Sequence, residues 1–426
     1  MFRPAVFAKT QNLRVLKKTL AAVAVLGAFA GSALAADVQL YGIVDTGLGY
    51  NHIDAGDLDG ASFKDWKGNE IVNFSDSDSF SMKSGQASGS RFGFKGTEDL
   101  GNGLTVGFIL ENGINSDDGT DAGVFFNRES SLFVQGNFGR FAMGRLGSIN
   151  NGQSSWAKVG MISAFGTSSW GGTSAQLGNL MSLAGQWDNM IAYETPDFAG
   201  FKVFAQYGMG SNDHENESSS DRYYAIGATY NNGPFAAYFA VDSINYQTAG
   251  LKNGLDGDDV DDSLTVTLGG SYDFEVVKVY LGGQYFDEVK LSSIGGVTND
   301  IMGDVDLNKF TEITSSYSAF TIGSLKVKGY GLSLTADAPV AGGKAMFGMG
   351  YVDAEAADSV VDMGFGDADL KRYIVSVGYD YPFSKRTDVY AVASYSQDKL
   401  DLQSVAIDDE YKFKTYSLYV GLRHRF

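Results

Sequence analysis

The residues best placed to act on a solute are three charged side chains, Arg91, Glu111 and Arg128. Arg91 lies on the opposite face of its segment from the apolar pair Phe92 and Phe94. If the chain folds back near residue 100 and again near residue 118, Glu111 lies beside Arg91 and Arg128 beside Glu111. Charges of both signs at one height on neighbouring strands would create a transverse electric field across a passage. The alternative, that the three are only solvated side chains, stays open.

The elements that would hold these charges are β-strands, because apolar and polar residues alternate with a period of two along the chain. We predict strands at 38–50, 87–97, 104–113, 124–135, 140–147, 187–195, 200–210, 222–231, 235–243, 263–272, 276–286, 326–336, 344–353, 372–380, 387–396 and 413–426. Their connections alternate between short turns and long polar loops, as in transmembrane barrels with short periplasmic turns and long external loops. The sequence therefore predicts an all-β protein, a 16-stranded antiparallel transmembrane β-barrel, with fourteen or eighteen strands as the alternatives.

The first 35 residues have the pattern of a cleaved export signal. Five basic residues precede an apolar run from Leu20 to Ala30, and Ala33 and Ala35 supply a small-residue cleavage site. We expect residues 1–35 to be removed and residues 36–426 to form one barrel domain. Removal changes the formal charge from −19 to −24, because five cations and no acid are lost.

Composition excludes several classes of function. Nucleic acid is not expected as a partner, since phosphate binding needs a basic surface. The absence of cysteine rules out disulfides, thiolate metal sites and a cysteine nucleophile. The acidic segment 256–262 lacks the spacing of an EF-hand loop. We therefore expect no cofactor, and at most weak binding of divalent cations at acidic external loops.

Segment 148–186 follows the fifth predicted strand and is rich in small and apolar residues, which suit packing inside a barrel. Phe165 and Trp170 would pack it against the interior. Within the segment, Lys158 is the one charged residue, and no acidic residue is present. Three further charged residues are expected to line the pore: Lys95, Asp45 and Lys158. Lys95 faces the same way as Arg91. Since cations outnumber acids in this set, a mild preference for anions is predicted.

The segment from Ser90 to Leu104, SRFGFKGTEDLGNGL, resembles a signature of the general porins of β-proteobacteria, of the neisserial and burkholderial type. Residues 38–45 (VQLYGIVD) resemble the first strand of that family, and residues 421–426 (GLRHRF) resemble its last. Phe138–Arg140 followed by Gly144 and Arg145 is similar to its fourth turn and fifth strand.

The resemblance implies a sixteen-stranded barrel in the outer membrane of a Gram-negative bacterium, an inward-folded third loop and a homotrimer. It also implies passive diffusion of ions and small hydrophilic solutes, contact with outer-membrane lipid and lipopolysaccharide, and Arg91, Glu111 and Arg128 as wall charges. The terminal Phe426 is interpreted as the signal read by the barrel-insertion machinery. Two departures from the family concern charge: the third loop lacks acidic residues, and Gln186-Trp187 stands where another lumen arginine is common.

Two other functions are compatible with a barrel in the outer membrane. A hydrolase at the barrel rim needs a histidine or an acidic pair beside a nucleophile, and the sequence has only His52, His214 and His424, in loops or on an outward face. We therefore expect no enzymatic activity. An adhesin or structural barrel stays open, because the long loops from 52–86 and 287–324 offer binding surfaces.

Overall fold

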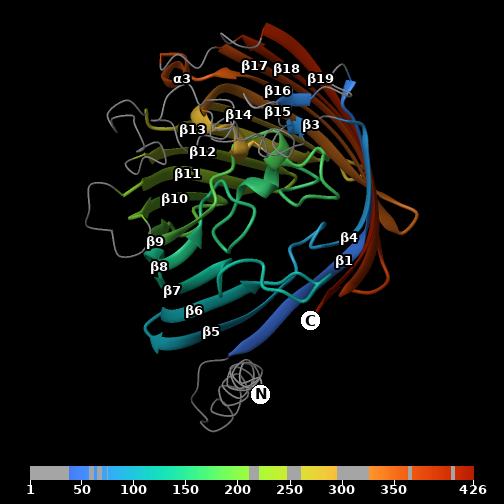
Figure 1. Ribbon diagram of the computed structural model, residues 1–426. Coiled ribbons are helices and arrows are strands. Elements are labelled where there is room, and N and C mark those ends of the chain that lie inside the picture. The colour runs from blue at the N-terminus through green and yellow to red at the C-terminus, as the bar shows by residue number, and fades with distance from the viewer. Residues whose placement is uncertain are drawn as a thin grey trace, which may run out of the picture.

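The computed structural model describes residues 38–56, 62–64, 70–73, 75–210, 220–246, 261–294, 326–362, 367–403 and 408–426. Most of them form one closed antiparallel sheet that surrounds a lumen (Figure 1). The barrel closes because β1 (Gln39–Asp54) pairs with β19 (Asp408–Arg425) on one side and with β4 (Ser77–Ser84) and β5 (Arg91–Gly101) on the other. No helix in this part of the chain is long and apolar enough to cross a membrane.

The other wall strands follow in chain order, each paired with the next. They are β6 (Leu104–Gly113), β7 (Glu129–Gly136), β8 (Gly139–Gly147), β9 (Gln186–Glu194), β10 (Phe201–Gly208), β11 (Arg222–Asn232), β12 (Phe235–Asn245), β13 (Leu264–Asp273), β14 (Lys278–Lys290), β15 (Lys326–Val340), β16 (Gly343–Ala356), β17 (Asp367–Pro382) and β18 (Thr387–Gln403). A small hairpin of β2 (Ser62–Lys64) and β3 (Glu70–Asn73) stands apart from the wall.

The sheet has seventeen strands but sixteen positions around the barrel. β4 pairs with β1 from Thr46 to Ile53, whereas β5 pairs with β1 from Gln39 to Ile43, so the two strands share one position. The predicted sixteen-stranded barrel is therefore confirmed, with one strand broken between residues 84 and 91.

Each wall strand presents an apolar face outward and a polar or small face inward. On β19, Tyr416, Leu418 and Val420 are exposed, whereas the alternating Ser417 and Tyr419 are buried. A closed sheet pairs every strand with two neighbours, which satisfies the backbone where the outside is lipid. The outward apolar face can therefore meet a bilayer.

The two ends of the barrel differ as predicted. Seven short turns join strands at one end, for example Gly136 to Gly139 and Val340 to Gly343, and the longer connections lie at the other end. Several late strands are longer than predicted: β18 has 17 residues and β19 has 18. The predicted export signal lies outside the described residues, as do His214 and most of segment 256–262.

Two predicted strands begin later than expected, and one strand was missed. The predicted strand 87–97 begins only at Arg91, and β4 lies within 52–86, which we expected to be a long loop. The predicted strand 124–135 begins only at Glu129, because the residues before it form a turn held by side chains. Asn112 Oδ1 accepts the Phe126 N–H at 2.7 Å, and Asn127 Oδ1 accepts the Gly113 N–H at 2.8 Å. Amide side chains compete in this way with the strand ladder for backbone groups.

Candidate functional site

The 38-residue stretch between β8 and β9, residues 148–185, runs through the interior of the barrel (Figure 1). We call it the constriction loop. Its backbone N–H groups donate to small polar side chains of the inner wall: Ala164 to Thr335 Oγ1 and Ala175 to Ser376 Oγ, both at 2.8 Å. Ser182 N–H donates to Gln284 Oε1 at 2.7 Å. The wall thus supplies acceptors that an irregular buried backbone needs.

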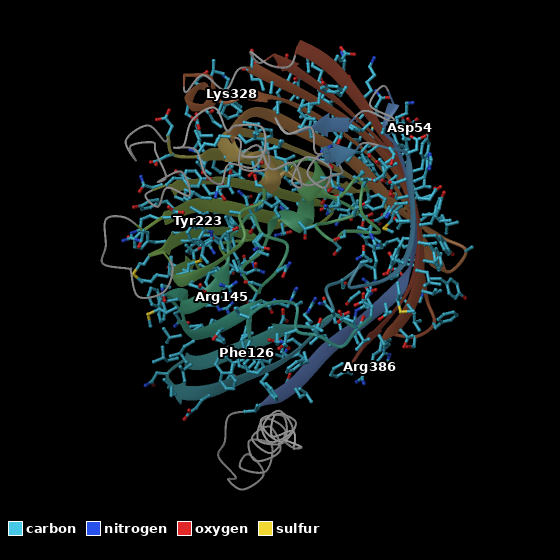
Figure 2. All side chains as sticks on the ribbon, in the orientation of Figure 1. Asp54, Phe126, Arg145, Tyr223, Lys328 and Arg386 are labelled. Carbon is cyan, nitrogen blue, oxygen red and sulfur yellow. The ribbon has the colours of Figure 1, made fainter. Side chains whose placement is uncertain are left out.

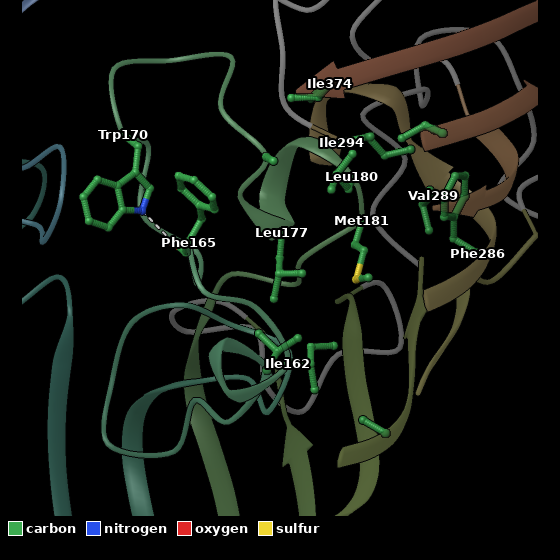
Figure 3. Close-up of a cluster of buried hydrophobic side chains, with 14 of the residues drawn as sticks. Ile162, Phe165, Trp170, Leu177, Leu180, Met181, Phe286, Val289, Ile294 and Ile374 are labelled. Carbon is green, nitrogen blue, oxygen red and sulfur yellow. Dashed lines mark hydrogen bonds between the residues drawn. The ribbon is translucent and has the colours of Figure 1, made fainter. Parts of the chain in front are cut away.

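Apolar packing holds the same loop, as the sequence predicted for Phe165 and Trp170. Both are nearly fully buried; their rings meet edge to face at 6.0 Å, and the Trp170 indole N–H donates to the Phe165 carbonyl at 2.6 Å (Figure 3). Leu177, Leu180 and Met181 are fully buried beside them. Full burial of one such side chain contributes about 1.5–3 kcal/mol, so the loop is held firmly.

Glycines on the inner wall let the loop approach the strands closely. A Cβ added to Gly331 would lie 1.6 Å from the Leu180 carbonyl oxygen, and one added to Gly350 would lie 2.3 Å from the Leu180 side chain. Neither distance can exist between real atoms. The wall at β15 and β16 is therefore fitted to the loop.

On the wall that begins with β5 and β6, Arg91, Glu111 and Arg128 come together; Arg91 is partly exposed, whereas Glu111 and Arg128 are buried (Figure 2 draws the side chains of the barrel). Arg128 Nε lies 2.6 Å from Glu111 Oε1, and Arg91 Nε lies 3.3 Å from Glu111 Oε2. The Tyr41 hydroxyl donates to the same Oε2 at 3.0 Å. Two guanidinium groups thus share one carboxylate, which leaves one positive charge in excess.

The constriction loop meets this cluster through an amide rather than an acid. Arg128 Nη1 donates to Gln153 Oε1 at 2.7 Å, and Gln186 Nε2 donates to the same oxygen at 2.9 Å. Gln153 thus occupies the place of an acidic loop residue, and Gln186 the place of a further lumen arginine, in the resembling family. The loop adds no negative charge to balance the arginines.

A second group of charges, which the sequence reasoning missed, lies along the wall towards β10. The Arg140 guanidinium lies over the Phe133 and Trp156 rings, at 4.4 and 4.7 Å. Glu129 accepts the Ser155 N–H at 2.8 Å, and Lys202 pairs with Glu194 at 2.8 Å. Strand alternation places all four side chains inward, and that alternation was the signal available in the sequence.

The other predicted pore residues differ in position. Lys95 faces inward and is exposed, 5.3 Å from the centre of the Tyr41 ring. Lys158 lies in the loop, with its ammonium donating to the Ser155 carbonyl at 3.0 Å. Asp45 has no exposed surface, so it does not line the open passage as we expected. Its carboxylate is covered by the segment from residue 85 to 90.

Asp45 instead holds the break between β4 and β5. Its Oδ2 accepts the N–H groups of Ala87 at 3.0 Å and Ser88 at 2.7 Å, and its Oδ1 accepts the Tyr390 hydroxyl at 2.6 Å. Tyr390 in turn packs edge to face on Trp170 at 5.4 Å. Asp45 thereby connects the broken strand to the constriction loop.

Phe426 closes the chain on the outer surface. Its backbone exchanges two hydrogen bonds with Gly42, at 3.1 and 3.2 Å, and its side chain is exposed. Its interpretation as an assembly signal stays a prediction.

The chemistry available in this lumen is electrostatic. In the described part of the chain, no group of three or more His, Asp or Glu side chains is placed to hold a metal ion. His52 pairs with Asp78 at 3.0 Å on the outside of the barrel, and His424 contacts Thr387 on the outward face. Below the loop, a cavity of about 400 Å³ is lined by Lys278 and Lys344 among others.

Comparison with known proteins agrees with this geometry. The family described as Gram-negative porin matches residues 21–401. An outer membrane porin protein of Bordetella pertussis is 33% identical, with 96% of this chain and all of that protein covered. Outer membrane porin protein 32 of Delftia acidovorans is 29% identical, again over 96% of this chain and all of the relative. Among solved structures, an anion-selective porin from Comamonas acidovorans has a TM-score of 0.61 at 25% identity, with 92% of this chain and all of that chain covered.

Proposed function

The chain belongs to the Gram-negative porin family, and from this premise we propose that its pore prefers small anions over cations. The barrel forms a water-filled channel in the outer membrane of a Gram-negative bacterium, and ions and small hydrophilic solutes cross it by passive diffusion. Family and fold point to a channel and not to an enzyme.

The observation that carries the anion preference is the sharing of Glu111 between Arg91 and Arg128. Of the other acids on this wall, Glu194 is paired with Lys202, and Glu129, which is hydrogen-bonded to Ser155 and Ser131, is balanced in number by Arg140. Lys95 and Lys158, by contrast, make no ion pair with any described residue. Uncompensated positive charge therefore lines the passage, and its field concentrates anions. The solved relative named as anion-selective supports the same reading.

Zero-current potentials across planar bilayers test the preference. In a salt gradient, the sign for the wild type should show anion selectivity. A unit charge about 8 Å from an ion in water contributes about 0.5 kcal/mol, with opposite sign for anion and cation. Arg91→Gln and Arg128→Gln should each lower the anion-to-cation permeability ratio about two- to fivefold, with Lys385→Gln, on a turn at the short-loop end, as the charge-matched control. Cation selectivity of the wild type, or equal shifts in control and test variants, would overturn the proposal.

We also propose that the channel is a homotrimer in contact with outer-membrane lipid, lipopolysaccharide included. Resemblance to the general porins supports this, and native electrophoresis tests it. Unheated protein should migrate as a trimer that becomes a monomer on heating, and bilayer steps should come in groups of three. A heat-stable monomer alone would contradict the proposal.

Two smaller proposals concern assembly and cofactors. We propose that Phe426 is read by the barrel-insertion machinery, so Phe426→Ala should lower the amount of barrel assembled in cells while refolding in detergent is unchanged. We further propose that the channel needs no cofactor and that its acidic external residues bind divalent cations at most weakly. Metal retained stoichiometrically after dialysis would contradict the second proposal.

A further inference from the structure

The outward face of β17 to β19 carries three lysines side by side, and Asp353 on β16 stands opposite the first of them, Lys371. Lys371, Lys399 and Lys412 are register partners on three adjacent strands, with Lys371 opposite Lys399 and Lys399 opposite Lys412. We call these three residues the lysine row. Residues directly opposite on neighbouring strands lie about 4.5–5.5 Å apart, and like charges so placed destabilise a sheet. A solvated surface has no reason to collect such a row.

A second row of one sign lies one step further from the membrane. Glu355 is opposite Asp369, Asp369 is opposite Asp401, and Asp401 is opposite Glu410. We call these four residues the carboxylate row. Its members face outward, because they alternate along their strands with buried residues such as Leu370 and Leu400.

Internal ion pairs compensate the lysine row only in part. Glu410 pairs with both Lys399, at 2.5 Å, and Lys412, at 3.0 Å. Lys371 forms no ion pair with any residue in the described ranges. Asp353, opposite Lys371 on β16, accepts the Tyr351 hydroxyl at 2.7 Å. In the described ranges Glu410 is thus the one carboxylate that forms ion pairs with the lysine row, and all three lysines remain partly or fully exposed.

Tyrosines fix the height of the lysine row. Below it on the same face, Tyr351 meets Tyr373 at 5.0 Å and Tyr395 meets Tyr416 at 5.2 Å, the arrangement of an aromatic girdle at a membrane interface. Lys371 is two residues from Tyr373, and Lys399 is four residues from Tyr395, which corresponds to about 5–10 Å above the girdle at ~3.3 Å per residue and ~40° tilt. Beneath the girdle the outward residues are apolar, Val375 and Leu418 among them.

From this layering we propose that the lysine row binds the phosphate groups of a phosphorylated glycolipid in the external leaflet, whose acyl chains lie along the apolar face below. The ammonium groups attract closely spaced phosphates, and the carboxylate row above repels them and so holds them at the level of the lysines. The proposal rests on the outer-membrane location of the barrel and not on its ion selectivity.

The test is native mass spectrometry of the membrane-extracted protein with lipid A that carries two phosphates. Its fully dephosphorylated form and phosphatidylglycerol are the comparison lipids. The triple variant Lys371→Gln, Lys399→Gln, Lys412→Gln should bind the diphosphorylated lipid about tenfold more weakly than wild type. A control removes two cations elsewhere: Lys385→Gln and Arg386→Gln at the opposite end of the barrel, where Figure 2 labels Arg386.

A second variant has an effect of opposite sign. Asp369→Asn with Asp401→Asn removes repulsion from the carboxylate row, so binding of the diphosphorylated lipid should become tighter, which a merely structural role would not cause. Wild-type affinity in the lysine-row variant, or equal affinity for the dephosphorylated lipid, overturns the proposal. Equal affinity for phosphatidylglycerol overturns the choice of a glycolipid. Because these residues lie outside the pore, conductance should stay at the wild-type value whatever the binding result.

Discussion

Gly331→Ala is the sharpest test of how the constriction loop sets the width of the pore. The new methyl group would lie 1.6 Å from the Leu180 carbonyl oxygen, whereas ordinary contact begins at 3.4 Å. One partner must therefore move by at least about 1.8 Å, the difference between the two distances. Gly331 is held in register by Gln284 on one side and Val352 on the other, so we expect the loop to move.

The displaced loop moves away from β15 and towards the wall that carries Arg91 and Arg128, so the open passage narrows. Overpacking of this kind costs about 1–3 kcal/mol. This cost weakens the packing of the loop against the wall and leaves the pairing of the strands intact. We expect a lower single-channel conductance, with a barrel that resists heat as the wild type does in unheated electrophoresis.

Gly283→Ala is the matched control, because Gly283 lies on neighbouring β14 but faces outward. A methyl group there would lie 3.2 Å from the exposed Leu332 side chain, which can shift into free space. Its conductance should equal that of the wild type. If Gly331→Ala also conducts like the wild type, the loop does not rest on β15 in the open channel and the argument fails.

Three other substitutions test the loop anchors. Thr173→Cys with Ser417→Cys should form a disulfide, since the two hydroxyl oxygens are 2.9 Å apart and the chain has no other cysteine. Oxidation should leave the conductance unchanged. A conductance that differs between oxidised and reduced protein would show that the loop leaves β19. Arg372→Gln leaves the buried Asp398 carboxylate without its two guanidinium bonds of 2.7 and 3.0 Å, and should lower the free energy of unfolding in urea by about 3–5 kcal/mol, with recovery when Asp398→Asn is added. Asp45→Asn weakens three buried hydrogen bonds and should cost about 2 kcal/mol and increase current noise, whereas a quiet, fully stable variant would argue against its role beneath Trp170.

The strands were predictable because the information is local. Alternation along 413–426 specifies both the strand and its outward face, and it needs no knowledge of the partner strand. The cluster of Arg91, Glu111 and Arg128 was predictable for a similar reason, since its members lie on or beside consecutive strands. Counting residues back from a turn gave their common height.

Contacts between distant segments were not predictable from such patterns. Asp45 was placed in the pore because the alternation along its strand predicts an inward side chain. In the structure it is covered by the segment from 85 to 90 and by Tyr390, which is 345 residues away. The break before β5 has the same origin, because Ser88 is held by Asp45 across 43 residues. The turn before β7 depends on hydrogen bonds from the side chains of Asn112 and Asn127. The alternation of apolar and polar residues carries no information about such bonds.

Two parts of the inner wall determine two different properties of the pore. The width of the pore and its ion preference can therefore change independently. From β10 to β19 many inward residues that meet the loop are small or neutral, such as Gly331, Thr335 and Ser376. The charged Arg372 also donates to the Asn179 carbonyl, but its charge is compensated by Asp398, so this side determines where the loop lies. The inward face from β5 to β8 carries the charged residues, of which Arg91, Lys95 and Arg140 are partly or fully exposed, whereas Glu111 and Glu129 are buried. Substitutions on the first side should therefore change conductance with little effect on ion preference, because they move the loop. Substitutions such as Arg91→Gln on the second side should change ion preference while the loop stays in place.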